Sequence, residues 1–175
     1  MVTFILPGGS VHNKEWAEAS AKKLSPDLHP RPIFWQRWET GVKEDDWIQK
    51  EADRIIALMA DQETSIVAKS IGTAVAMTVL AQKPAPVKKL ILCGLPLNDL
   101  EESDEKLYEA LSYFPAQNLL VFQNEADPHG DLLAVKQLLE GINPEIKVIS
   151  KPRRDHEYPY FSDFSDFLKQ SQFTS

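Results

Sequence analysis

The chain has 175 residues, with 19 Lys and Arg, 26 Asp and Glu, and one cysteine. This length accommodates one domain, residues 1–175, but not two of ordinary size. The formal net charge of −7 argues against a protein that binds the nucleic-acid backbone, because such proteins are normally basic. A hydrophobic share of 43% is enough to build a core, so the composition excludes wholesale disorder.

The sequence contains no segment that resembles a targeting or membrane signal. The N-terminus has no basic lead and only a short apolar run before Pro7, so we do not expect a signal peptide. No stretch approaches the ~20 apolar residues that cross a bilayer. Cys93 is the single cysteine and has no partner for a disulfide or a cysteine-based zinc site. We therefore expect a cytoplasmic protein without a membrane partner, and the oligomeric state stays open.

Six short apolar runs alternate with longer amphipathic segments along the chain. The runs comprise residues 2–6, 32–36, 65–68, 90–93, 119–123 and 146–149. Most are continuously apolar, which is typical of strands that are covered on both faces. Apolar residues recur at helical spacing in residues 48–59, 132–139 and 160–168. This order predicts an α/β fold, a three-layer sandwich with a mostly parallel six-stranded sheet.

A serine follows the third run directly, at the start of a segment of small and apolar residues. Ala68 and Gly72 lie two positions before and after Ser70. A nucleophile on a sharp strand-to-helix turn needs small neighbours because the flanking backbones nearly touch. The pattern departs from G-x-S-x-G, since Ala68 stands at the first glycine position. The alternative is that Ser70 only caps the helix that begins near Ile71.

An acid and a histidine follow the fifth and sixth runs, at the edge of a parallel sheet where ligands bind. Asp127 comes a few residues after the fifth run, and His156 lies on the loop before the last helix. Asp127 could instead begin a turn, with Glu125 or Asp131 as the acid. His156 could be a surface histidine. Two other histidines have the surroundings of surface residues: His29 and His129.

In this chain order, Ser70, Asp127 and His156 resemble the catalytic triad of the α/β-hydrolase superfamily, in a small form without a large cap. The resemblance covers nearly the whole chain, although the family's N-terminal antiparallel strands and cap insertion are missing. It implies that Ser70 is the nucleophile and that His156 takes its proton and later returns it to the leaving group. Asp127 would hold the imidazole and stabilise its cation.

The resemblance also implies an oxyanion hole beside Ser70. One donor would be the backbone N–H of Ile71, and the second would come from Gly9 or Ser10 in the turn after the first run. We expect substrate-pocket residues at four further positions: His12, Trp35, Trp38 and Leu95. The tryptophans could equally be core residues, and His12 could make a helix-start hydrogen bond. Residues 95–114 could form a lid or an ordinary helix on the sheet.

Lys69, beside the serine, could contact an anionic substrate, or it could face solvent or a neighbouring acid. Other site chemistries lack their motifs. The phosphate-binding pattern G-x-x-x-x-G-K-[ST] and the dinucleotide pattern G-x-G-x-x-G are absent, and His156 lacks the second histidine of H-E-x-x-H.

We therefore predict a serine hydrolase that needs no metal and no cofactor. It would act on small carboxylic esters or thioesters through an acyl-enzyme. The alternative is a catalytically silent hydrolase-like domain that binds a protein partner, which the small size of the chain and the imperfect turn at Ser70 motivate.

Overall fold

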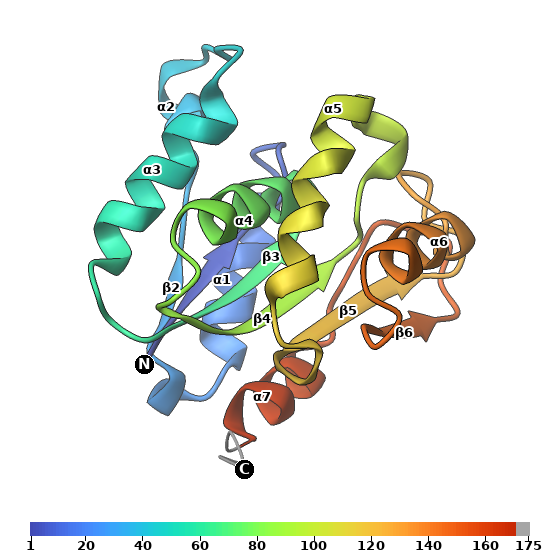
Figure 1. Ribbon diagram of the computed structural model, residues 1–175. Coiled ribbons are helices and arrows are strands. Elements are labelled where there is room, and N and C mark those ends of the chain that lie inside the picture. Colours follow the sequence, from blue (N-terminus) through green and yellow to red (C-terminus); the bar gives the residue numbers. More distant parts are fainter. Residues whose placement is uncertain (171–175) are drawn as a thin grey trace.

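Six parallel strands form the centre of the molecule (Figure 1), in a computed structural model that describes residues 1–170. The strands are β1 (Val2–Leu6), β2 (Pro30–Pro32), β3 (Thr64–Lys69), β4 (Val87–Cys93), β5 (Leu119–Asn124) and β6 (Lys147–Lys151). Their order in the sheet is β2-β1-β3-β4-β5-β6, and each pair of neighbours is parallel. The predicted α/β class and the six-stranded sheet are confirmed.

Helices cover both faces of this sheet (Figure 1). The α-helices are α1 (Asn13–Lys23), α2 (Arg37–Thr40), α3 (Trp47–Met59), α4 (Ile71–Gln82), α5 (Glu102–Glu105), α6 (Leu132–Ile142) and α7 (Phe161–Lys169). Short 3-10 helices are η1 (Pro26–Leu28), η2 (Leu97–Asp99), η3 (Lys106–Tyr113) and η4 (Ala116–Asn118). Among residues 1–170, no helix combines the length and apolar character that crossing a membrane requires.

The continuously apolar strands divide their side chains between two cores. Phe4 and Leu6 belong to the core that also contains the buried residues of α3, α4 and α6, whereas Ile5 belongs to the core under α1 and α7. Leu92 and Cys93 on β4 divide between the same two cores. Because successive side chains of a strand point to opposite faces, an unbroken apolar run is what a strand buried on both sides requires.

The two edge strands differ from the prediction. β2 covers Pro30–Pro32 and not residues 32–36, because Trp35 leaves the sheet and is buried in the core. β6 is shifted to Lys147–Lys151, and most of its side chains are exposed. An edge strand pairs on one side only, so β2 tolerates its prolines, which lack an N–H. Burial on both faces was therefore the wrong expectation for these two strands.

The strand order reverses between β1 and β3. From β1 the chain moves to one side of the sheet, to β2, and from β3 it moves to the other side, to β4 and beyond. The ends of β1 and β3 lie side by side, with Leu6 in register with Ala68. In open parallel sheets such a reversal forms a crevice at the carboxyl ends of the strands. The turn after β1 and the residue after β3, Ser70, meet at this point.

Candidate active site

Ser70 occupies a strained turn between β3 and α4. Its backbone has φ of 56° and ψ of −131°, a conformation that costs a non-glycine residue about 1–3 kcal/mol. The Ser70 N–H donates to Cys93 O on β4 at 2.9 Å, and Thr73 donates both its N–H and its hydroxyl to Ser70 O. The Ser70 hydroxyl makes no capping hydrogen bond to α4. The alternative that this serine only caps the helix is therefore wrong.

Gly72, two residues after Ser70, has to be small because the turn after β1 lies against it. A Cβ at Gly72 would lie 2.5 Å from Pro7 O and 2.6 Å from Leu6 O, closer than real Cβ atoms approach backbone. Only glycine lets the first turn of α4 come this near to the end of β1. The amide of Ile71 is thereby held beside the turn that contains Gly9.

Asp127, in the loop after β5, and His156, in the loop after β6, form a hydrogen-bonded pair. His156 Nδ1 lies 2.7 Å from Asp127 Oδ2, and the Asp127 side chain is fully buried. Asp127 also accepts the Tyr158 hydroxyl at 2.5 Å and the His129 N–H at 2.9 Å. Burial alone would raise the pKa of Asp127, but the hydrogen bonds from His156, Tyr158 and His129 outweigh it and lower that pKa. The carboxylate is therefore charged at neutral pH.

The alternative acids have other roles. Asp131 accepts the Ala134 N–H at 2.9 Å and caps α6, while Glu125 is exposed. Both expected surface histidines lie at the surface: His29 is exposed, and the side chain of His129 is 44% exposed. Its ring centroid lies 4.3 Å from that of His156, and its Nδ1 lies 2.5 Å from Asp99 Oδ2. The loop after β5 therefore brings this imidazole into the site.

A cavity of about 750 Å³ lies where these loops meet. Its lining includes Ser70, Ile71, Gly9, Ser10 and His156. The other lining residues come from the start of α1, from residues 37–48, from residues 96–104 and from the loop after β5: Asn13, Arg37, Lys43, Asp45, Trp47, Ile48, Pro96, Asp99, Leu100, Glu101, Asp104 and His129. The serine and the imidazole thus face one common space, at the crevice that the strand order predicts.

The second nitrogen of the His156 imidazole has no hydrogen-bond partner among the described residues. His156 Nε2 is buried and has no hydrogen-bond partner within residues 1–170, so no hydrogen bond joins it to Ser70 in this structure. The ring fits here because of Gly94, which has φ of +61° and whose Cβ would lie 3.0 Å from His156 Cε1. Hydrogen bonds between catalytic groups are often long before substrate binds.

The three expected oxyanion residues lie together. A Cβ at Gly9 would be 3.2 Å from Ile71 Cγ2, and Gly9, Ser10 and Ile71 all line the cavity with Ser70. None of the three backbone N–H groups donates a hydrogen bond to any residue in the described part of the chain, residues 1–170. Unpaired amides at the start of a helix and in an adjacent turn can stabilise a developing negative charge.

The structure corrects the predicted substrate pocket, because none of its four residues lines the cavity. Trp35 is fully buried, and its indole N–H donates to Gly8 O at 2.9 Å. The Trp38 indole N–H donates to Gly9 O at 2.9 Å. Leu95 is buried, and its N–H donates to Gln123, whereas His12 is exposed at the start of α1. The two tryptophans therefore stabilise the turn after β1 by hydrogen bonds to its carbonyls and do not line the substrate pocket.

Lys69 faces neither solvent nor the cavity. Its ammonium group is buried, donates to Asn13 Oδ1 at 2.9 Å, and lies 3.7 Å from Glu157 Oε2. Burial lowers the pKa of Lys69, and the Glu157 charge partly opposes this shift. A contact with an anionic substrate is thus not available to this side chain.

Two residues that support the site were not identified from the sequence. Tyr158 holds Asp127, and the Asn124 amide donates to the carbonyls of Asp155 and Glu157, on either side of His156. Polar side chains at the end of a buried strand were the available signal for Asn124. Residues 95–114 are not one ordinary helix, because they divide into η2, α5 and η3, and residues 96–104 of this segment contribute to the lining of the cavity.

The architecture matches that of solved hydrolase structures. A protein from Xanthomonas campestris, described as an α/β serine hydrolase without lid, aligns with a TM-score of 0.65 and 19% identity over 96% of this chain and 78% of its own. A cold-adapted esterase from an Arctic intertidal metagenomic library aligns at 0.65 and 16% identity, over 95% and 79% of the two chains. Naproxen esterase from Bacillus subtilis aligns at 0.64 and 11% identity, over 95% and 81%.

The chain has the α/β-hydrolase fold. Within residues 1–170, the sheet is all-parallel and has six strands. No family model and no curated protein sequence matches the chain. α/β hydrolases have a strained turn between a strand and a helix that presents one side chain at the top of the sheet. In this chain, Ser70 lies on such a turn, directly after β3.

Proposed function

We propose that this α/β-hydrolase fold is a serine hydrolase that cleaves small carboxylic esters or thioesters, with Ser70, His156 and Asp127 as its catalytic triad. One observation carries the proposal. A buried, charged carboxylate holds one nitrogen of His156 at 2.7 Å, the other nitrogen has no partner within residues 1–170, and His156 and Ser70 line one cavity. An imidazole held in this way is set to accept a proton at Nε2.

In the acylation step, Ser70 Oγ forms a bond to the substrate carbonyl carbon while its proton passes to His156 Nε2. The carbonyl oxygen becomes an oxyanion beside the unpaired amides of Ile71 and the turn after β1. The C–O or C–S bond then breaks, and the leaving group takes the proton from His156. The products of this step are the alcohol or thiol and an acyl ester of Ser70.

Water completes the cycle. It gives one proton to His156 Nε2, attacks the acyl carbon, and releases the carboxylic acid as Ser70 recovers its proton. Asp127 stays ionised throughout and stabilises the transient imidazolium. The lowered pKa of Asp127 supports this role, since the carboxylate needs to remain charged when its partner is protonated.

A fluorophosphonate probe tests the proposal, because it phosphonylates only an activated serine. We expect wild-type protein to be labelled at Ser70 and to hydrolyse short p-nitrophenyl esters, and Ser70→Ala to do neither. Ser150→Ala, which removes an exposed hydroxyl on β6, is the matched control and should behave as wild type. Labelling that persists in Ser70→Ala would remove Ser70 from the nucleophile's role.

The second candidate is a catalytically silent domain that binds a protein partner. The observation that favours it is the absence of a hydrogen bond between His156 Nε2 and the Ser70 hydroxyl within residues 1–170. Wild-type protein that resists the probe and turns over no ester of any chain length would support this candidate over the hydrolase.

A further inference from the structure

Residues 35–38 hold the turn after β1 by its carbonyl groups. Trp35 Nε1 donates to Gly8 O at 2.9 Å. Gly9 O accepts two further hydrogen bonds, from Trp38 Nε1 at 2.9 Å and from Arg37 Nη2 at 2.6 Å. These three donors lie within four residues of one segment, and they meet two consecutive carbonyls of the turn.

The direction of these carbonyls sets the direction of the amides. In a trans peptide the C=O and the following N–H point in opposite directions, and residues 1–170 contain no cis bond. Gly8 O therefore opposes the Gly9 N–H, and Gly9 O opposes the Ser10 N–H. Both amides lack a partner within residues 1–170, and both residues line the cavity of Ser70.

We propose that Arg37 is a positioning residue for the oxyanion hole. Together with Trp38, it fixes the Gly9–Ser10 peptide so that the Ser10 N–H faces the cavity of Ser70, and the charge of Arg37 makes this N–H a stronger donor. This inference rests on the proposed function of Ser70. A hydrogen bond to a carbonyl polarises its peptide and makes the N–H a stronger donor. A cation on that carbonyl gives a charge-assisted bond, which is stronger than a neutral one.

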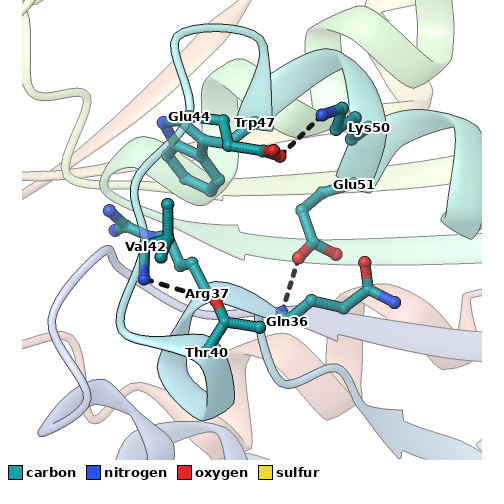
Figure 2. A pocket seen from close by; sticks show the side chains of 8 residues that line it. All are labelled: Gln36, Arg37, Thr40, Val42, Glu44, Trp47, Lys50 and Glu51. Carbon is teal, nitrogen blue, oxygen red and sulfur yellow. Dashed lines mark hydrogen bonds and ion pairs between the residues drawn. The ribbon is translucent and has the colours of Figure 1, made fainter.

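The Arg37 guanidinium is held close to the turn on its other sides. Its carbon lies 4.1 Å from the Trp47 ring centroid, and both side chains line a second cavity of about 270 Å³ behind the turn (Figure 2). A Cβ at Gly9 would lie 2.7 Å from Arg37 Nη2. Burial lowers the pKa of Arg37 and Glu51 opposes the shift, but an arginine keeps its charge at neutral pH.

The segment that carries Arg37 is itself fixed from α3. Glu51 is buried on α3 and accepts the Gln36 N–H at 2.6 Å, as Figure 2 shows. Arg54 binds Glu51 and donates to Phe34 O at 2.8 Å. The backbone on the N-terminal side of Arg37 is thus held at two points, so its guanidinium is directed at the turn rather than into solvent.

The other end of the turn is held from α1. Ser10 O accepts the Asn13 N–H at 2.9 Å and the Asn13 side-chain amide at 3.2 Å. Lys69 Nζ in turn binds Asn13 Oδ1. The carbonyls of residues 8, 9 and 10 are therefore all engaged, whereas the Gly9 and Ser10 amides stay free for a ligand oxygen.

The first test is kinetic and uses Arg37→Met, with Arg31→Met as the matched loss of an exposed arginine on β2. With p-nitrophenyl acetate we expect kcat/KM of Arg37→Met to fall about 10- to 100-fold, almost entirely in kcat, because the lost interaction acts on the transition state. Arg37→Lys should recover part of the rate, and millimolar guanidinium should partly rescue Arg37→Met. Trp38→Phe removes the neighbouring donor and provides a second variant where Arg37→Met folds poorly.

The second test does not depend on activity. In amide NMR spectra, we expect the Ser10 N–H resonance to shift in Arg37→Met and Trp38→Phe but not in Arg31→Met. An unshifted Ser10 amide together with unchanged kcat in a folded Arg37→Met protein would overturn the inference and leave the hydrolase proposal intact. Wild-type protein that hydrolyses no ester would overturn the hydrolase proposal, and the Ser10 shift would still decide whether Arg37 positions the turn.

Discussion

The two sides of the candidate site are built in different ways. On the acid–base side, the chemical groups are side chains, His156 and Asp127, and a dense set of hydrogen bonds from neighbouring side chains holds them. On the proposed oxyanion side, the chemical groups would be backbone amides of Gly9, Ser10 and Ile71, and side chains hold the turn that contains Gly9 through its carbonyls. A substitution can remove the imidazole or the carboxylate on the acid–base side, whereas on the oxyanion side a side-chain substitution can only displace a backbone amide.

The largest effect should come from removing the proton carrier. We expect His156→Gln to lower kcat for p-nitrophenyl acetate about 10⁵-fold, because serine then has no base and the leaving group has no acid. His29→Gln, at an exposed histidine, is the control and should keep the wild-type rate. A His156→Gln enzyme within tenfold of wild type would show that this imidazole is not the base.

A somewhat smaller loss should follow from Asp127→Asn. The amide can donate to His156 Nδ1, which stabilises the wrong tautomer and leaves Nε2 unable to accept the serine proton, so we expect kcat to fall about 10⁴-fold. The measurement is steady-state hydrolysis in both variants. Asp131→Asn, which alters the cap of α6 in the same loop, should keep normal kcat. Equal activity of Asp127→Asn and Asp131→Asn would contradict the assignment of the acid.

Much of the acid–base side can be predicted from the sequence, because its residues come directly after buried apolar strands. Ser70, Asp127 and His156 follow β3, β5 and β6, where a parallel sheet collects its loops. The closeness of His129 to His156 could not be predicted, because a histidine between proline and glycine has only the local pattern of a surface turn. Its contact with His156 depends on how two loops fold together.

The oxyanion side is harder to predict, because a backbone amide leaves no mark in the sequence. The tryptophans of residues 35–38 could be assigned to a pocket wall or to the core, and their hydrogen bonds to Gly8 and Gly9 depend on long-range packing. The edge strands β2 and β6 were misplaced for a related reason. Pairing on one side only does not need a continuous apolar run, so their limits follow from the neighbouring strand.

A substitution on the oxyanion side should have an intermediate effect. We expect Gly9→Ala to lower kcat/KM about 10- to 100-fold, because its Cβ would lie 2.7 Å from Arg37 Nη2 and would push the guanidinium off the turn. Gly141→Ala, whose added Cβ meets nothing within 4 Å, is the control. Unchanged kcat/KM in Gly9→Ala would mean that the turn tolerates movement and that its amides do not contact the oxyanion.

The smallest effect concerns stability in acid. The pKa of Asp127 is lowered in the folded protein from its ordinary value of 3.8, so its ionised form stabilises the fold at higher pH. That contribution is complete above the unfolded-state pKa and is lost as the pH falls through the lower folded-state pKa. We expect the free energy of urea unfolding to fall more steeply below pH 4 in wild type than in Asp127→Asn. Parallel slopes would contradict the lowered pKa.

Trapping the acyl-enzyme tests directly whether Ser70 and His156 act as one nucleophilic unit. Protein quenched in acid during turnover of p-nitrophenyl acetate is analysed by intact mass and peptide mapping. We expect one acetyl group on the peptide that contains Ser70 in wild type, and none in Ser70→Ala or His156→Gln. Acetyl groups spread over lysines, or equal acetylation of Ser70 in His156→Gln, would contradict this expectation.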